Sequence, residues 1–222
     1  MFDQPLKQQA AGLGRRSLGF FDNDIVKADR RIDQQVQFAH PAIPVAPDSF
    51  TAKIPRFASV SPDGRTVVFE SLGKLYMKSG NGEAKRVTKL PDTLHELDPS
   101  FSRSGDALVF TTWNDTDLGA VHMMDVSSGK ITTITQNPGQ YRRPVLSPDG
   151  EFVTYEKDSG GYLTSELYSS NPGIYVQAAD GSDPVRVSSS GRHPHFGADN
   201  LRIYFTTSKN KKNALVSTND VT

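Results

Sequence analysis

Two histidines separated by one residue, His193 and His195, have the spacing in this sequence that best suits a metal ion. Alternate residues at a strand end can converge on one divalent cation, and imidazole is a common zinc ligand. A complete site needs more ligands, but His40, His95 and His122 are scattered along the chain, and there is no cysteine. We therefore predict no metal site and no cofactor in this chain.

The serines do not form a nucleophile motif. The sequence has no Gly-x-Ser-x-Gly and no His-Glu-x-x-His. Gly80-Asn81-Gly82 lacks the Lys-Ser/Thr that follows a phosphate-binding loop, so it indicates a hairpin turn. Ser61, Ser102 and Ser147 recur at one position of an internal repeat, where a serine has a structural use. We predict that this chain has no catalytic residue of its own.

The composition excludes several functional classes. The 222 residues include 25 Lys and Arg and 25 Asp and Glu, so the formal net charge is zero, whereas nucleic-acid-binding domains usually have a basic excess. No apolar run approaches the roughly 18 residues of a membrane span. The N-terminal residues lack the apolar stretch of a signal peptide, about 7–15 residues long. We predict no nucleic-acid partner and no membrane span.

A four-residue turn recurs along the chain at intervals of 41, 45 and 50 residues. It reads Ser61-Pro62-Asp63-Gly64, Ser102-Arg103-Ser104-Gly105, Ser147-Pro148-Asp149-Gly150 and, in decayed form, Gly197-Ala198-Asp199-Asn200. Glycine and asparagine at the last position favour a tight turn, because they tolerate a positive φ. We expect the recurring aspartate to bond the turn backbone and not to bind calcium, which needs several oxygen ligands.

Apolar residues stand three and five positions after each turn. They are Val67 and Phe69, Leu108 and Phe110, Val153 and Tyr155, and Ile203 and Phe205. This alternation is typical of a strand with one buried face. A further strand pattern precedes each turn, and one or two more follow the alternating strand. Each unit therefore contains up to four antiparallel strands.

Units of four strands with a period of about 40–50 residues are typical of β-propeller blades. We predict an all-β fold, a β-propeller of about four blades at 56–97, 98–141, 142–191 and 192–222, the last incomplete. A β-sandwich of unrelated hairpins is the alternative, and the shared offsets argue against it. Residues 1–55 are expected to form a tail and a proline-rich connector. Its Arg31–Phe38 segment either supplies a strand to the last blade or belongs to a larger propeller.

Three of the four units have an arginine eight residues before the last turn residue: Arg56, Arg142 and Arg192, with Leu97 in the second unit. The first strand of a propeller blade lines the central channel, so equivalent positions form a ring. A partial ring of guanidinium groups favours an anionic ligand or the carboxylates of a partner. The alternative is three solvated arginines paired with local acids such as Glu96 or Asp98.

The longest insertion of the repeat spans Asp158–Pro172. Among its glycines and serines stand four apolar residues, Tyr162, Leu163, Leu167 and Tyr168. Exposed apolar residues on a long loop often mark a contact surface. We expect this loop either to pack on a neighbouring domain or chain, or to fold over the edge of its own blade.

The turn followed by an aromatic-bearing strand resembles the repeats of TolB-like and tricorn-like propellers. A second stretch resembles the propeller region of large bacterial amidohydrolases, and this resemblance extends over roughly residues 50–216. The residues that carry it are Gly160-Gly161-Tyr162, Ser169–Val176, Asp180-Gly181, Gly191–Gly197 and Ile203–Phe205. The resemblance implies a longer protein, a periplasmic location and a metal-dependent catalytic domain downstream, none of which this sequence itself displays.

These observations lead to two functional hypotheses. In the first, the chain is a non-catalytic binding or scaffolding module of a larger amidohydrolase-type hydrolase, where it supports the catalytic domain or controls access to it. In the second, it is a self-contained small propeller that binds a peptide or protein partner. In both, the expected partner is a protein, a peptide or a neighbouring domain.

Overall fold

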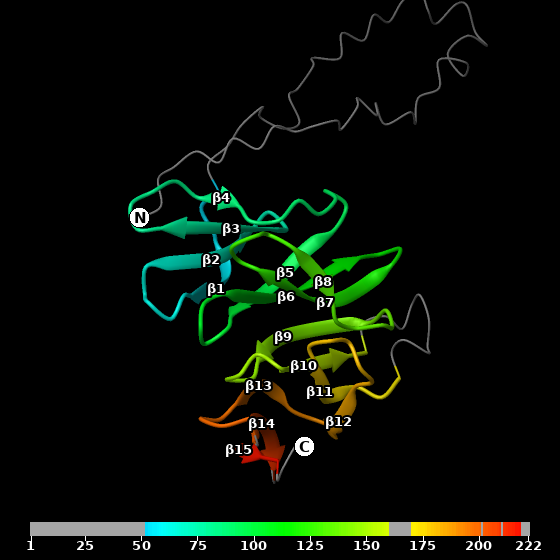
Figure 1. Cartoon of the computed structure of the whole chain (residues 1–222). Coiled ribbons are helices and arrows are strands. Elements are labelled where there is room, and N and C mark those ends of the chain that lie inside the picture. The colour runs from blue at the N-terminus through cyan, green and yellow to red at the C-terminus, as the bar shows by residue number, and fades with distance from the viewer. Residues whose placement is uncertain (1–51, 160–169, 201, 210, 219–222) are drawn as a thin grey trace, which may run out of the picture. The chain divides into compact units, whose positions relative to one another are not determined.

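The computed structural model describes residues 52–159, 170–200, 202–209 and 211–218 (Figure 1). Within these ranges the regular elements are fifteen β-strands and no helix, which confirms the predicted all-β class. No helix that could cross a membrane is found in the described part of the chain. The segment Arg31–Phe38 and the residues Tyr162, Leu163, Leu167 and Tyr168 lie outside the described residues.

The strands form four separate antiparallel sheets, which follow one another along the chain (Figure 1). Blade 1 contains β1 (Arg56–Val60), β2 (Thr66–Ser71), β3 (Lys74–Ser79) and β4 (Lys85–Arg86). Blade 2 contains β5 (His95–Phe101), β6 (Ala107–Asn114), β7 (Leu118–Asp125) and β8 (Ile131–Thr133). In each sheet the strands pair in chain order, so every blade is a simple meander.

The second half of the chain repeats this plan. Blade 3 contains β9 (Gln140–Leu146), β10 (Phe152–Asp158), β11 (Gly173–Ala178) and β12 (Val185–Ser188). Blade 4 contains β13 (Arg192–Phe196), β14 (Ile203–Lys209) and β15 (Lys212–Ser217) and is three-stranded within the described residues. The predicted propeller blades are confirmed, and the last one has three strands among the described residues.

The recurring turn joins the first two strands of a blade. In blade 1 the Ser61 hydroxyl donates to Asp63 Oδ1 at 2.6 Å, and the backbone N–H of Arg65 donates to the same oxygen at 3.0 Å. The N–H of Thr66 donates to Ser61 Oγ at 2.9 Å. These bonds lower the pKa of Asp63, the serine contributing most. The serine and aspartate of the repeat therefore hold the turn, as the sequence predicted.

Apolar side chains fill the space between consecutive blades. Val68 and Leu75 of blade 1 pack with Phe110 of blade 2, and the two further interfaces have clusters of the same kind. The residues of the second and third interfaces include Val109, Val121 and Tyr155, then Ile174, Ile203 and Phe205. Blades 2 and 3 thus each have two buried faces, and burial of these side chains is the main force that stacks the blades.

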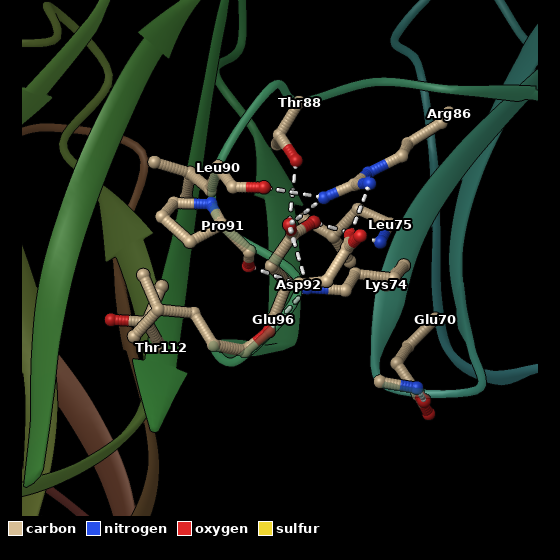
Figure 2. A network of polar contacts seen from close by, with 12 residues as sticks. Glu70, Lys74, Leu75, Arg86, Thr88, Leu90, Pro91, Asp92, Glu96 and Thr112 are labelled. Carbon is tan, nitrogen blue, oxygen red and sulfur yellow. Dashed lines mark hydrogen bonds and ion pairs between the residues drawn. The ribbon is translucent and has the colours of Figure 1, made fainter. Parts of the chain in front are cut away.

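A buried carboxylate, Glu96 at the start of blade 2, adds a polar contact to blade 1 (Figure 2). It accepts hydrogen bonds from the backbone N–H of Leu75 at 2.9 Å and from the Thr88 hydroxyl at 2.6 Å. Figure 2 shows Lys74 and Arg86 directed toward it, with ion-pair distances of 3.9 and 3.5 Å. Because its oxygens are hydrogen-bonded and paired with cations, this buried charge is compensated and fixes the join between the two blades.

The turns of successive blades meet at one end of the innermost strands. Arg103, on the turn of blade 2, donates to the backbone oxygens of Gly197 and Ala198, on the turn of blade 4. The Asp149 and Asn200 side chains bond each other between blades 3 and 4. An arginine that reaches from blade 2 to blade 4 requires these turns to converge, as they do around a propeller axis.

Candidate functional site

The first strands of the blades contact one another and are therefore the innermost ones. The three predicted arginines lie on these strands at one repeated position, which pairs with the second strand. The pairs are Arg56 with Glu70, Leu97 with Thr111, Arg142 with Glu156 and Arg192 with Thr206. This position is near the start of the innermost strand, at the end away from the turns.

The next residue in each blade has a left-handed backbone. The φ angle is 50° at Phe57, 50° at Asp98, 49° at Arg143 and 57° at His193. The strand register shifts through a bulge at the same place in all four blades. Such a backbone costs a non-glycine residue about 1–2 kcal/mol. Bulges re-aim side chains and are frequent beside functional sites, so this repeated bulge marks the arginine end of the strands as a candidate site.

Arg142 connects three blades. Its Nε donates to Asp98 Oδ2 of blade 2 at 2.9 Å, and its guanidinium carbon lies 5.8 Å from the ring centre of Phe57 in blade 1. The Arg56 guanidinium lies 5.6 Å from the same ring centre. A cation within about 6 Å of an aromatic centre, over its face, is attracted to the ring. Two of the predicted arginines, Arg56 and Arg142, therefore meet at Phe57.

Glu156 extends this set of contacts into blade 4. It accepts two hydrogen bonds from Arg143, at 2.9 and 3.1 Å, and one from the backbone N–H of His193 at 2.6 Å. Arg192 lies 3.9 Å from the same carboxylate. The third predicted arginine is thus joined to the first two through Arg143, whose own N–H donates to Asp98 at 3.1 Å. We call this continuous set the arginine cluster: Arg56, Phe57, Asp98, Arg142, Arg143, Glu156 and Arg192.

The charges of the cluster are partly compensated. Arg56 Nε donates to the buried Glu70 at 2.6 Å, and this bond and the charge of Glu70 raise the pKa of Arg56. The Arg56 and Arg192 side chains are nevertheless 57% and 60% exposed. Four guanidinium groups face three carboxylates here. The site can therefore bind a carboxylate or another anion while its inner oxygens hold the arginines in place.

A groove of about 730 Å³ opens between blades 3 and 4 at the Arg192 end of the cluster. Glu156, Arg192 and His193 line it together with polar side chains that include Thr206 and Asn213. A groove of mixed polar and apolar surface beside an exposed guanidinium group suits an extended ligand such as a peptide.

The sequence pointed to three members of this cluster and missed the others. Phe57, Arg143 and Glu156 were not singled out, and Asp98 appeared only as a local partner for an arginine. The position after each arginine differs in residue type from blade to blade, so no residue pattern indicated a shared bulge. An acid six residues after the turn glycine, Glu70 and Glu156, was a signal that could have been found.

The histidine pair has two different environments. The N–H of His193 bonds Glu156 of the preceding blade, whereas the His195 ring stacks on Tyr204, with ring centres 5.8 Å apart. Among the described residues, no group of three or more histidine, aspartate or glutamate side chains is placed to hold a metal ion. The expectation that the chain needs no cofactor stays a prediction.

No known protein-family model matches the chain. Seventy-eight residues, 35% of the chain, are 31% identical to the Tol-Pal system protein TolB of Francisella tularensis subsp. tularensis (strain WY96-3418). A match of equal length, 78 residues, is 30% identical to TolB of Francisella tularensis subsp. mediasiatica (strain FSC147). The chain spans 16% of the length of these curated relatives.

Solved structures extend the likeness over most of the chain. The crystal structure of TolB from Acinetobacter baumannii matches 78% of the chain with a TM-score of 0.58 and 19% identity, and 43% of that structure is covered. Oligogalacturonate lyase from Vibrio parahaemolyticus matches 73% of the chain with a TM-score of 0.58 and 12% identity, and 50% of it is covered. At these identities the likeness shows the fold alone: the chain has a TolB-like β-propeller fold.

Proposed function

We propose that this chain is a non-catalytic binding module, in which the arginine cluster receives carboxylate groups of a protein or peptide partner. The observation that carries the proposal is the convergence of Arg56, Arg142 and Arg192 on one set of contacts at one end of the innermost strands. Exposed guanidinium groups beside Phe57 offer both charge and apolar contact, a combination frequent where proteins bind one another.

The charges inside the cluster favour recognition over catalysis. Each arginine already contacts an acid, which fixes its direction and spares a ligand the cost of ordering a flexible side chain. The exposed side chains of Arg56 and Arg192 can form charge-assisted hydrogen bonds with a ligand, and such bonds are stronger than neutral ones. The expected partner is an acidic peptide segment.

Fluorescein-labelled hexaglutamate is a suitable probe, with binding followed by fluorescence anisotropy at low salt. The double variant Arg56→Gln/Arg192→Gln is expected to weaken binding at least tenfold. Arg65→Gln/Arg202→Gln removes the same charge from exposed positions elsewhere and is expected to weaken binding much less. Equal weakening by the two variants would show that only the overall charge matters and would refute the proposal.

We further propose that this module belongs to a larger amidohydrolase-type protein, in which it supports or gates a metal-dependent catalytic domain. The support is the sequence resemblance over Ser169–Val176 and Gly191–Gly197. The encoding DNA tests this directly. A reading frame that continues into a barrel with His-x-His after a strand supports the hydrolase parent. A frame without such a barrel leaves the second hypothesis, a self-contained propeller that binds a partner.

A further inference from the structure

The hairpin between β14 and β15 (Figure 1) carries three exposed lysines, Lys209, Lys211 and Lys212. Lys209 and Lys212 pair across the hairpin. No ion pair within the described residues involves any of the three, whereas every arginine of the arginine cluster contacts an acid. We call these three residues the lysine hairpin, a basic surface without a local counter-charge in that part of the chain.

The lysine hairpin lies at the same end of blade 4 as the arginine cluster. Arg192 pairs with Thr206 on β14, and Lys209 is three residues further along that strand. A strand rises about 3.3 Å per residue, so the two positions are about 10 Å apart along the strand. An extended peptide segment of about three to four residues is long enough to reach both.

The groove between blades 3 and 4 joins the two positions. Arg192 lines it, and so do Ser208 and Asn213, which pair with each other next to the Lys209–Lys212 pair. Hydroxyl and amide groups can bond the backbone of a peptide that lies between two charged ends. The groove residues that carry such groups are Ser189, Ser190, Thr206, Thr207, Ser208 and Asn213.

The charges of the groove itself are balanced. Glu156 and Asp158 line it together with Lys157 and Arg192. Glu156 is buried and already accepts hydrogen bonds from Arg143. The excess positive charge at this end of blade 4 therefore comes from the lysine hairpin.

The equivalent hairpin of blade 2 has the opposite charge. It joins β6 to β7 and carries the exposed Asp115 and Asp117. Like charges repel and opposite charges attract across an interface, which sets the direction in which a charged segment lies. An acidic segment held at the arginine cluster is thus favoured over blade 4 and disfavoured over blade 2.

We propose that the lysine hairpin is a second subsite for the acidic peptide, which runs outward from the arginine cluster along the groove between blades 3 and 4. This inference rests on the proposed function and adds the direction of the peptide and its second set of contacts. Carboxylates about three residues apart on the peptide contact Arg192 and the lysine hairpin, at the spacing of the two positions along β14.

Two fluorescein-labelled peptides test the second subsite by fluorescence anisotropy at low salt: hexaglutamate and Glu-Glu-Ser-Ser-Ser-Ser, whose acids reach only one subsite. Lys209→Gln/Lys212→Gln is expected to weaken hexaglutamate binding about fivefold and to change binding of the second peptide less than about twofold. The control, Lys85→Gln/Lys130→Gln, removes the same charge from exposed lysines toward the repeat-turn end of blades 1 and 2. It is expected to change binding of either peptide less than about twofold.

Carbodiimide cross-linking, which joins carboxylates to lysine amines, locates the bound hexaglutamate. Mass spectrometry is expected to find the peptide on the lysine hairpin in preference to Lys85 and Lys130. The same cross-links should decrease in Arg56→Gln/Arg192→Gln, because the arginine cluster is the first anchor of the peptide.

Three results would overturn the second subsite. The lysine variant could weaken hexaglutamate binding no more than its control, it could weaken both peptides equally, or the cross-links could be spread over all exposed lysines. If Arg56→Gln/Arg192→Gln still weakens binding more than its own control, the proposed function stands and only the second subsite is refuted. If that arginine variant behaves like its control, the proposed function itself fails.

Discussion

The Nε of Arg142 donates a hydrogen bond to Oδ2 of Asp98 at 2.9 Å and so joins the innermost strands of blades 2 and 3. The same Asp98 oxygen accepts the N–H of Arg143, at the strand bulge. One carboxylate thereby holds both an arginine of the candidate site and the backbone that positions it. The candidate site and the join between blades share this residue.

Replacing Asp98 with asparagine removes the charge and keeps a residue that tolerates the left-handed backbone. The bonds from Arg142 and Arg143 then lose their charge assistance, so the free energy of unfolding is expected to fall by about 1–2 kcal/mol. Urea denaturation measures this. The control is Asp92→Asn, because Asp92 forms an exposed ion pair with Arg86 and exposed pairs contribute at most about 1 kcal/mol. Equal losses in the two variants would contradict the structural role of Asp98.

Glu96→Gln is expected to be strongly destabilising, because it removes the buried carboxylate that forms an ion pair with the buried Lys74. Burial already lowers the pKa of Lys74. Removing one partner of a buried pair typically costs about 3–5 kcal/mol, and the Lys74 bonds to the Pro91 and Leu94 carbonyls place the expected loss near the lower end. Urea denaturation at pH 7 tests this, with the exposed Glu83→Gln as the control. A loss no greater than that of the control would show that Glu96 contributes little.

His122 is expected to make stability depend on pH. It is buried between the hydroxyls of Thr112 and Thr133, at 2.9 and 3.1 Å from its ring nitrogens, and burial lowers its pKa from 6.5 to about 4. The unfolded chain binds this proton more tightly, so the stability contributed by neutral His122 is complete above pH 6.5 and is lost as the pH falls toward 4. A shift of this size corresponds to about 3 kcal/mol.

The variant His122→Gln provides the comparison. Between pH 7 and pH 4.5, the urea midpoint should fall farther for the unmodified chain than for the variant. Carboxylates titrate in both proteins, but only the unmodified chain has the histidine. Parallel pH profiles for the two proteins would exclude His122 as a cause of acid sensitivity.

Gly173 is expected not to tolerate alanine. Its φ is 151°, and a Cβ atom there would lie 2.1 Å from the backbone oxygen of Ser188 on the paired strand. Gly80 has a φ of 51° but open space around its Cβ position. Gly80→Ala should therefore cost only the backbone strain, about 1–2 kcal/mol, and Gly173→Ala clearly more. Thermal melts of the two variants make the comparison, and a smaller loss for Gly173→Ala would show that the strands of blade 3 separate easily.

Much of the fold follows from local sequence. The Ser-x-x-Gly turns fix where the first two strands of a blade meet, and the apolar residues three and five positions later fix which face is buried. These signals operate within a few residues, so they can be read without knowing what lies across the interface. The same regularity placed Arg56, Arg142 and Arg192 at one equivalent position.

The partners of those arginines could not be read in this way. Asp98 and Arg142 are 44 residues apart, and their contact exists only because the blades stack with their first strands side by side. The bulge that turns Phe57 toward Arg142 depends on strand pairing and not on residue type. Sequence alone determined the repeat, the blade and the equivalent position of the three arginines, because these arise from local periodicity. The tertiary structure decided which acids meet which arginines, because these contacts depend on packing between distant repeats.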